Sequence, residues 1–251
     1  MGITEDSGRL ERDGLPALAW RRVRGGSPTV VWLGGFRSDM GGTKAEVLAA
    51  AARERGWSCL RFDYRAHGES EGDWEAATIG AWRRDALDAI DRLTDGPLVL
   101  VGSSMGGWMA CLAALARPER VKALVLIAPA PDFTEKLMRP ALSPEAVAAI
   151  ARDGKWMEPS ADYGPYAITG AFLDEGRDWM ILDGPIPIQS PVRILQGALD
   201  EPVPWRHALK LAEAIESEDV VFSLIKDGDH RLSRPQDLER LIRTVEEAVA
   251  L

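Results

Sequence analysis

Ser104 is the residue of the chain whose surroundings point most directly to chemistry. Residues 102–106 read Gly-Ser-Ser-Met-Gly, a G-x-S-x-G pattern with Ser104 at its centre. An apolar run at 97–101 precedes the pattern, and a helix-like run follows it, so a sharp strand-to-helix turn is predicted to expose the serine. The glycines allow neighbouring backbone to pack closely against such a strained turn. Ser104 is the predicted nucleophile, and a glycine-rich turn without chemistry is the alternative.

A serine hydroxyl is a weak nucleophile unless a base lies beside it, and the chain has three histidines. His230 follows a predicted strand at 220–225 through a short loop, so it should leave the sheet at the same edge as Ser104. It also comes last in the order serine, acid, histidine that is usual after a nucleophile elbow. His207 lies in a predicted helix and is expected on the surface, and His67 is expected to be a turn and packing residue. His230 is the predicted base.

The acid that orients such a histidine should follow the strand before it. Asp200 comes after a predicted strand at 192–195 and a turn glycine. It would hold the imidazole in one tautomer and stabilise the imidazolium. Glu201 is adjacent but would point elsewhere, whereas Asp227 and Asp229 are expected to make turn hydrogen bonds near the histidine. Asp200 is the predicted acid.

Backbone N–H groups must stabilise the negative charge that develops on the substrate oxygen during serine attack. The amide of Met105, directly after the serine, is one predicted donor. The other is the amide of Phe36, in the turn after the predicted strand at 29–33, where two glycines leave the backbone exposed. A simple tight turn is the alternative for this segment.

Short apolar runs alternate with helix-length amphipathic segments along most of the chain. The predicted strands cover residues 29–33, 58–62, 97–101, 121–128, 192–195 and 220–225. The predicted helices cover residues 43–55, 76–93, 105–116 and 204–215, with a last one from residue 235. Thr43 and Glu46 have the spacing of a capping box. The alternation predicts an α/β fold with a mostly parallel sheet and helices on both faces.

The alternation breaks at residues 129–191, a segment with nine prolines and no clear strand. Helices are predicted at 144–152 and 165–175. A long interruption in an α/β domain is usually functional, so residues 129–191 are interpreted as a helical lid and residues 1–128 and 192–251 as the core domain. An apolar substrate pocket is predicted from three aromatic residues, each of which could instead pack the lid onto the body. These are Trp108, Tyr163 and Trp179.

The composition of the 251 residues is that of a globular protein, with 46% hydrophobic and 27% charged residues. The net charge of −9 disfavours nucleic acid and anionic membranes as partners. No apolar run is long enough to span a bilayer, and no signal-peptide pattern precedes the first strand. Cys59 and Cys111 lie in apolar runs and can make neither a disulfide framework nor a metal site unaided. Such sparse cysteine usage fits a reducing compartment. A cytoplasmic protein is expected, and a composition rich in alanine and arginine is typical of bacterial proteins.

Together these motifs resemble the serine α/β-hydrolase superfamily, and more closely the subgroup of abhydrolase-domain-containing protein ten. That subgroup comprises mitochondrial acyl-protein thioesterases and acyl-glucuronide esterases, with bacterial relatives. The resemblance rests on segments spread over almost the whole chain: residues 41–44, 61–64, 102–108, 116–119, 203–205 and 229–231. It implies Ser104, Asp200 and His230 as a triad, Phe36 and Met105 as oxyanion donors, a small lid and no cofactor. Mitochondrial import is not carried over as an expectation, because no basic, serine-rich pattern is recognised at the start of the given sequence.

The expected activity is therefore hydrolysis of a carboxylic ester or thioester, with a small acyl compound as substrate. A peptidase or a cofactor-free haloperoxidase on the same fold is the first alternative. Dehalogenases and epoxide hydrolases are disfavoured because they use a carboxylate where Ser104 stands. A non-catalytic interaction protein is the second alternative, and the ordered serine, aspartate and histidine argue against it.

Overall fold

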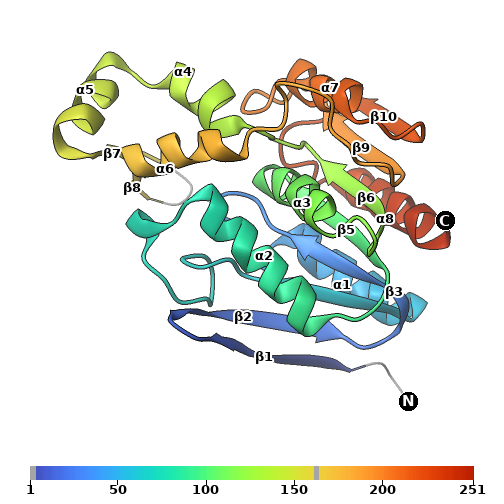
Figure 1. Cartoon of the computed structure of the whole chain (residues 1–251). Coiled ribbons are helices and arrows are strands. Elements are labelled where there is room, and N and C mark those ends of the chain that lie inside the picture. The colour runs from blue at the N-terminus through green and yellow to red at the C-terminus, as the bar shows by residue number, and fades with distance from the viewer. Residues whose placement is uncertain (1–3, 161–163) are drawn as a thin grey trace.

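The computed structural model, which describes residues 4–160 and 164–251, contains an eight-stranded sheet in the order β1-β2-β4-β3-β5-β6-β9-β10 (Figure 1). From β4 to β10 the neighbouring strands are parallel, whereas β1 and β2 are antiparallel additions at one edge. The strands are β1 (Glu5–Arg12), β2 (Leu15–Val23), β3 (Gly26–Leu33), β4 (Trp57–Phe62), β5 (Leu98–Ser103), β6 (Val121–Ile127), β9 (Val192–Gly197) and β10 (Val220–Ile225). The predicted mostly parallel sheet is confirmed.

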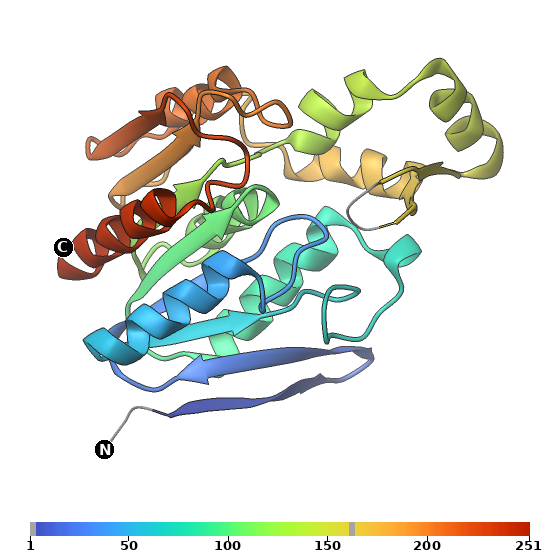
Figure 2. The ribbon, with the colours of Figure 1, turned by 180° about the vertical axis from the view of Figure 1, so that it is seen from behind.

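Helices cover both faces of this sheet. Helices α1 (Thr43–Arg55) and α8 (Pro235–Ala250) lie on the face seen in Figure 2. Helices α2 (Ile79–Leu93) and α3 (Met105–Ala116) lie on the opposite face, and α7 (Trp205–Ala214) packs into the same apolar cluster as these two. All six residues of β5 are buried, as expected for a central strand with an apolar layer on each side. The predicted helices therefore lie where the alternating pattern places them.

Two local predictions need correction at the start of the chain. The hairpin of β1 and β2 was not predicted, because β1 is a polar edge strand in which only Leu10 and Arg12 are buried. The capping box predicted at Thr43 is absent, since Gly42 is the N-cap and makes no side-chain cap. The Glu46 carboxylate instead accepts a hydrogen bond from Arg61 on β4 at 2.5 Å. A long-range ion pair thus replaces the local cap.

The segment between β6 and β9 leaves the sheet at the end of β6 and forms the part drawn in yellow-green to orange in Figure 1. Its elements are η2 (Thr134–Met138), α4 (Arg139–Ala141), α5 (Pro144–Asp153), β7 (Lys155–Glu158), β8 (Tyr166–Thr169), α6 (Gly170–Glu175) and η3 (Gly176–Trp179). The expectation of no strand here is wrong, because β7 and β8 pair as an antiparallel hairpin. The helix predicted at 165–175 begins only at Gly170, since the Thr169 hydroxyl caps it by accepting from the Phe172 amide.

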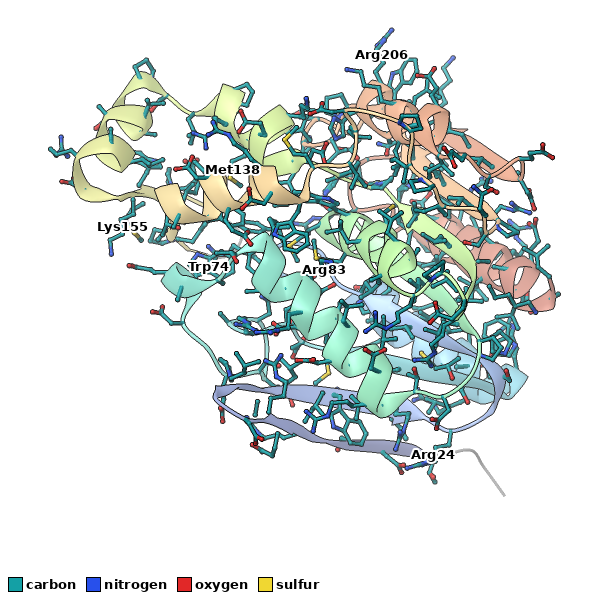
Figure 3. All side chains as sticks on the ribbon, in the orientation of Figure 1. Arg24, Trp74, Arg83, Met138, Lys155 and Arg206 are labelled. Atoms are coloured by element: carbon teal, nitrogen blue, oxygen red, sulfur yellow. The ribbon has the colours of Figure 1, made fainter. Side chains whose placement is uncertain are left out.

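This segment is attached to the sheet domain at several points. The Trp74 indole on η1 (Trp74–Ala76) donates to the Ala167 carbonyl on β8 at 2.9 Å, and Lys155 pairs with Glu75 at 2.6 Å. Figure 3 shows Trp74 and Lys155 where the hairpin meets the body. Within the segment itself, the buried Asp132 carboxylate accepts from the amides of Ile181 and Leu182, both at 2.9 Å. The beginning and end of the segment are therefore tied together.

Within the described ranges, no helix combines the length and apolar character needed to cross a membrane. In the same residues, no three His, Cys, Asp or Glu side chains gather as a metal site would require. Cys59 and Cys111 are both buried and unpaired, and burial raises the pKa of each thiol to about 12. Both thiols therefore stay protonated and act as small apolar residues.

Candidate active site

Ser104 occupies a sharp turn between β5 and α3, with φ 54° and ψ −118°. Positive φ is costly for a residue with a side chain, so the surrounding structure must hold the turn. The Ser104 amide donates to the Ile127 carbonyl on β6 at 2.9 Å. Its carbonyl accepts from the amides of Gly107 at 2.9 Å and Ala130 at 3.1 Å. These bonds fix the serine at the carboxyl end of the central strand.

The two glycines of the motif are required by close backbone approach. A Cβ atom on Gly106 would overlap the Leu33 carbonyl oxygen at the end of β3. One on Gly102 would overlap the Gly106 carbonyl oxygen in the first turn of α3. Both positions have a φ that any residue adopts, so the restriction is steric. The glycines thus let α3 begin directly against the strands.

His230 and Asp200 meet at the carboxyl ends of β10 and β9. The Nδ1 atom of His230 lies 2.8 Å from Oδ2 of Asp200, whose side chain is fully buried. That oxygen also accepts from the Gln196 side-chain amide at 2.9 Å, and Oδ1 accepts from the Val203 amide at 2.8 Å. A carboxylate that accepts at Oδ2 places the imidazole proton on Nδ1, which leaves Nε2 as a base.

The backbone holds the loops that carry these two residues against each other. The Leu199 amide donates to the Gly228 carbonyl at 2.9 Å, which joins the loop after β9 to the loop after β10. A Cβ on Gly197 would come within 2.5 Å of the Gly228 and Asp229 carbonyl oxygens. Parallel pairing of the strands and this contact together explain how residues 30 positions apart become partners.

The other acids near His230 have different partners. Asp229 accepts from the Leu232 amide at 2.9 Å, as expected for a turn residue. Asp227 pairs with Arg234 at 2.8 Å at the start of α8, and this pairing lowers the pKa of the exposed Asp227 carboxyl. Glu201 is exposed. Only Asp200 among these residues hydrogen-bonds to the His230 ring in the part of the chain that the structure describes.

A cavity of about 500 Å³ brings Ser104 and His230 together with Phe36 and Met105. The segment between β6 and β9, called the insertion from here on, contributes most of an apolar wall: Phe133, Leu137, Met138, Ala141 and Tyr166, joined by Val203 from the loop after β9. Arg37 and Glu158 contribute charged groups at its border. A second cavity of about 490 Å³, bordered by polar residues such as Asp39, Thr43 and Lys44, also reaches Ser104 and His230. The serine and histidine thus lie between an apolar and a polar space.

The amides of Phe36 and Met105 lie in the two turns that border Ser104. Met105 is the first residue of α3, whose N-terminal amides have no partner within the helix. Phe36 follows Gly35, where a Cβ would stand 3.5 Å from Cβ of Ser104 and 3.3 Å from the Ser103 carbonyl oxygen. The arrangement can present two backbone donors to a group bound at the serine.

The aromatic residues predicted to line the pocket are placed elsewhere or not described. Trp108 is fully buried below the cavity, and its indole donates to the Trp179 carbonyl at 3.2 Å. Trp179 packs under Arg83 and donates to Glu175 at 2.7 Å, so it joins the insertion to α2. Neither belongs to the cavity wall formed by the described residues. Tyr163 lies outside the described residues.

The cavity wall contains residues that the prediction of the pocket missed. Leu137 and Met138 form an apolar pair in an otherwise proline-rich segment, which is the one local signal that could have indicated them. Tyr166 stacks against Arg37, whose guanidinium carbon is 4.3 Å from the ring centroid. These residues become neighbours only when the insertion folds back over Ser104.

The two remaining histidines are both buried. The surface position expected for His207 is wrong, because its Nε2 donates to the Pro131 carbonyl at 2.7 Å and anchors α7 to the start of the insertion. His67 is a turn and packing residue, as expected, and its ring lies against those of Trp74 and Trp82. Burial lowers the pKa of both imidazoles, so both are neutral near pH 7.

Comparison with known proteins agrees with this architecture. Residues 28–158 match the family model described as alpha/beta hydrolase fold. The chain belongs to the α/β-hydrolase fold family. It is 38% identical over 242 residues to the human protein named palmitoyl-protein thioesterase ABHD10, mitochondrial, covering 96% of this chain and 79% of that protein.

Two solved α/β-hydrolase structures are similar over nearly the whole chain. Mouse alpha/beta hydrolase domain-containing protein 10 has a TM-score of 0.90 and 38% identity, with 98% of each chain covered. A putative hydrolase from Agrobacterium vitis S4 has a TM-score of 0.92 and 38% identity, with 99% of this chain and 100% of that chain covered. The resemblance to the ABHD10 group is thereby confirmed in sequence and in structure.

Proposed function

We propose that this α/β-hydrolase cleaves carboxylic esters or thioesters through an acyl-enzyme on Ser104. The observation that carries the proposal is the 2.8 Å contact between His230 Nδ1 and the buried Asp200, at a cavity that His230 shares with Ser104. The contact engages Nδ1, which supports Nε2 as the atom that acts on the serine. Ser104 is the nucleophile, His230 the base and Asp200 the acid in this proposal.

In the acylation step, His230 Nε2 takes the hydroxyl proton as Ser104 Oγ attacks the acyl carbon. The amides of Phe36 and Met105 hold the oxyanion of the tetrahedral intermediate. Asp200 stabilises the imidazolium that has formed. As the intermediate collapses, His230 gives the proton to the departing alcohol or thiol, and the acyl group remains on Ser104.

Deacylation repeats these steps with water as the nucleophile. His230 removes a proton from a water molecule that attacks the acyl carbon, and the same two amides hold the second oxyanion. Collapse releases the carboxylic acid and returns the proton to Ser104. Apart from the substrate and water, all groups in this cycle belong to the chain, so the proposed reaction uses no cofactor.

The apolar cavity supports an acyl chain as the group retained on the enzyme. Phe133, Leu137 and Met138 can bury hydrocarbon beside Ser104, and such burial contributes about 0.8 kcal/mol per CH₂ group. The name of the human relative describes a palmitoyl-protein thioesterase. An acyl thioester therefore belongs to the proposed substrates, beside oxygen esters. Residues 129–191 act as the lid that completes this cavity over a core of residues 1–128 and 192–251.

Two alternative functions, a peptidase and a non-catalytic interaction protein, would require a different site. A peptidase has to bind an extended main chain, whereas the wall around Leu137 and Met138 offers mainly apolar side chains. An interaction protein without activity has no need of a strained serine in the same cavity as a histidine paired with a buried aspartate. The cytoplasmic location expected from the sequence stays a prediction, and the curated relatives are named as mitochondrial.

The proposal is tested with a panel of acyl esters, acyl thioesters, acyl glucuronides and peptides, assayed with the wild type and Ser104→Ala. Ser7→Ala, on the exposed edge strand β1, is the matched serine control. Ester or thioester turnover should be lost in Ser104→Ala and retained in Ser7→Ala. Turnover of peptides alone would favour the peptidase. No turnover of any substrate would favour an interaction protein.

A further inference from the structure

His67 makes a hydrogen bond to the backbone of the turn that carries Phe36. The Arg37 amide donates to His67 Nε2 at 3.1 Å, although the two residues are 30 positions apart. The other ring nitrogen, Nδ1, lies 3.1 Å from the Arg65 carbonyl oxygen. A carbonyl can only accept, so Nδ1 carries the proton and Nε2 has the lone pair that the Arg37 amide needs. Both ring nitrogens are thus used by backbone groups.

The ring of His67 is held rigidly in a buried site. His67 is 4% exposed. The rings of Tyr64, Trp74 and Trp82 surround its imidazole at centroid distances of 5.8, 5.4 and 5.2 Å. Burial also lowers the pKa of the imidazole, which favours the neutral form that can accept a hydrogen bond. The Nε2 lone pair is used by the Arg37 amide, and His67 borders a cavity that is separate from the one containing Ser104.

The carbonyl that orients the ring is itself fixed by α2. Asp85 on α2 is fully buried and accepts from the Arg65 amide at 2.8 Å and from its guanidinium at 2.6 Å. The Trp82 indole donates to the same Arg65 carbonyl at 3.2 Å. A chain of contacts therefore leads from α2 through Arg65 and His67 to the Arg37 amide.

The turn of Phe36 and Arg37, where this series of contacts ends, depends on such support. Arg37 has φ 60°, a left-handed conformation that is uncommon for a residue with a long side chain. A second tie joins the same two loops, because the buried Asp63 accepts from the amides of Met40 at 2.7 Å and Glu69 at 2.8 Å. Residues 37–40, directly after Phe36, are thus tied to the loop of His67 at both ends.

The Phe36 amide lies one peptide unit before the bond to His67. Anchoring the Arg37 N–H restrains the ψ angle of Phe36 and the path of the turn, and so the direction in which the Phe36 N–H points. Oxyanion donors act because they are oriented before the reaction, and misplacement by about 1 Å can cost about a hundredfold in rate. Loss of the acceptor at His67 would free this turn without touching the substrate cavity.

We infer that His67, as the neutral Nδ1–H tautomer, is a positioning residue that holds the Phe36 amide in place as an oxyanion donor. This inference rests on the proposed function, since it assigns a role within the same reaction. His67 does not line the cavity that contains Ser104, so its effect passes through the backbone of Arg37.

Two substitutions of His67 separate this role from packing. In His67→Gln, the side-chain amide reaches the place of Nε2 and its oxygen can accept from the Arg37 N–H. In His67→Asn, the shorter side chain can still donate to the Arg65 carbonyl but cannot reach the Arg37 N–H. Both variants lose the imidazole ring contacts and differ from each other by one methylene group. Thermal melting of both measures what that difference does to stability.

Relative to His67→Gln, His67→Asn should lower kcat for an acyl ester by about 10- to 100-fold, with KM within about threefold. It should also weaken binding of an alkyl trifluoromethyl ketone by a similar factor, because the ketone adduct on Ser104 carries an oxyanion and resembles the transition state. Binding of the corresponding alkyl alcohol, which has no oxyanion, should be unchanged.

Equal kcat and equal ketone affinity in the Asn and Gln variants would overturn the inference, whether both match the wild type or both fall. Ser104→Ala, assayed alongside, distinguishes this from failure of the proposed function. If Ser104→Ala retains turnover, the proposed function fails and the inference fails with it. If Ser104→Ala is inactive and the two His67 variants are alike, only the role of His67 is refuted.

Discussion

His230 and Asp200 are 30 positions apart, yet Nδ1 of the histidine lies 2.8 Å from Oδ2 of the aspartate. The aspartate side chain is fully buried, whereas 27% of the histidine side chain is exposed. Two other donors, the Val203 amide and the Gln196 side chain, fix the carboxylate in the orientation that meets the imidazole. The pair thus joins a rigid buried anion to a ring that reaches a cavity beside Ser104.

Asp200→Asn should lower kcat of the proposed reaction by about 10³- to 10⁴-fold, since an amide can no longer favour the Nδ1–H tautomer or stabilise the imidazolium. Asp229→Asn is the matched control, because Asp229 lies beside the histidine in sequence but binds the Leu232 amide. It should retain activity within about threefold. Steady-state kinetics on one acyl ester check both, and a larger loss in Asp229→Asn would reassign the acid.

Gly106→Ala should lower the free energy of unfolding by about 1–3 kcal/mol or prevent folding, because the added methyl group would overlap the Leu33 carbonyl oxygen. Gly184→Ala adds the same methyl group where no atom lies within 4 Å, so it should change the stability by less than about 1 kcal/mol. Urea denaturation measures both. Equal stability of the two variants would contradict the close approach of α3 to β3.

The buried His207 should make the protein less stable in mild acid. Burial lowers the pKa of the folded imidazole below its unfolded value of about 6.5, and the charges of Lys210 and Lys136 lower it further. Below about pH 6.5 the unfolded chain therefore binds the proton more readily, and the free energy of unfolding falls with pH until the folded pKa is passed.

His207→Gln removes this titration while keeping a donor for the Pro131 carbonyl. In urea denaturation between about pH 5 and pH 7.5, the variant should lose less stability on acidification than the wild type. His67 titrates in the same direction, so part of the pH dependence should remain. Identical slopes for variant and wild type would show that His207 does not contribute.

Leu137→Trp should reduce the room for long acyl chains in the cavity beside Ser104. We expect kcat/KM for a decanoyl ester to fall by about tenfold or more, since one methylene group in an apolar pocket is already worth about 1–3 kcal/mol. For an acetyl ester, kcat/KM should change by less than about threefold. Val147→Trp, at an exposed position on α5, is the control. Equal effects on both esters would place the acyl chain elsewhere.

Sequence patterns sufficed for the features that depend on local order. Short apolar runs located β3 to β6, β9 and β10, and the G-x-S-x-G pattern located the turn at Ser104. Asp200 and His230 could be chosen because the carboxyl ends of parallel strands share one edge of a sheet. Their catalytic roles, and those of the Phe36 and Met105 amides, stay predictions.

Features that depend on distant partners could not be predicted in this way. Strand β1 is recognisable only through its pairing with β2 and through the ion pair of the buried Arg12 with Asp85 at 2.5 Å. The hairpin of β7 and β8 lies in a proline-rich segment for which the sequence predicts only helices and loops. Which residues line the cavity depends on how the insertion packs against the sheet domain. The sequence therefore predicts Trp108, which does not line the cavity, and does not indicate Leu137, which does.

The most direct test of the proposed function is to trap the acyl-enzyme. The protein is mixed with a slowly hydrolysed acyl ester, quenched in acid within the first turnover, and analysed by intact mass and peptide mapping. The mass of one acyl group should be found on the peptide that contains Ser104, and Ser104→Ala should carry none. Steady turnover with no adduct on Ser104, or an adduct on another residue, would contradict the account.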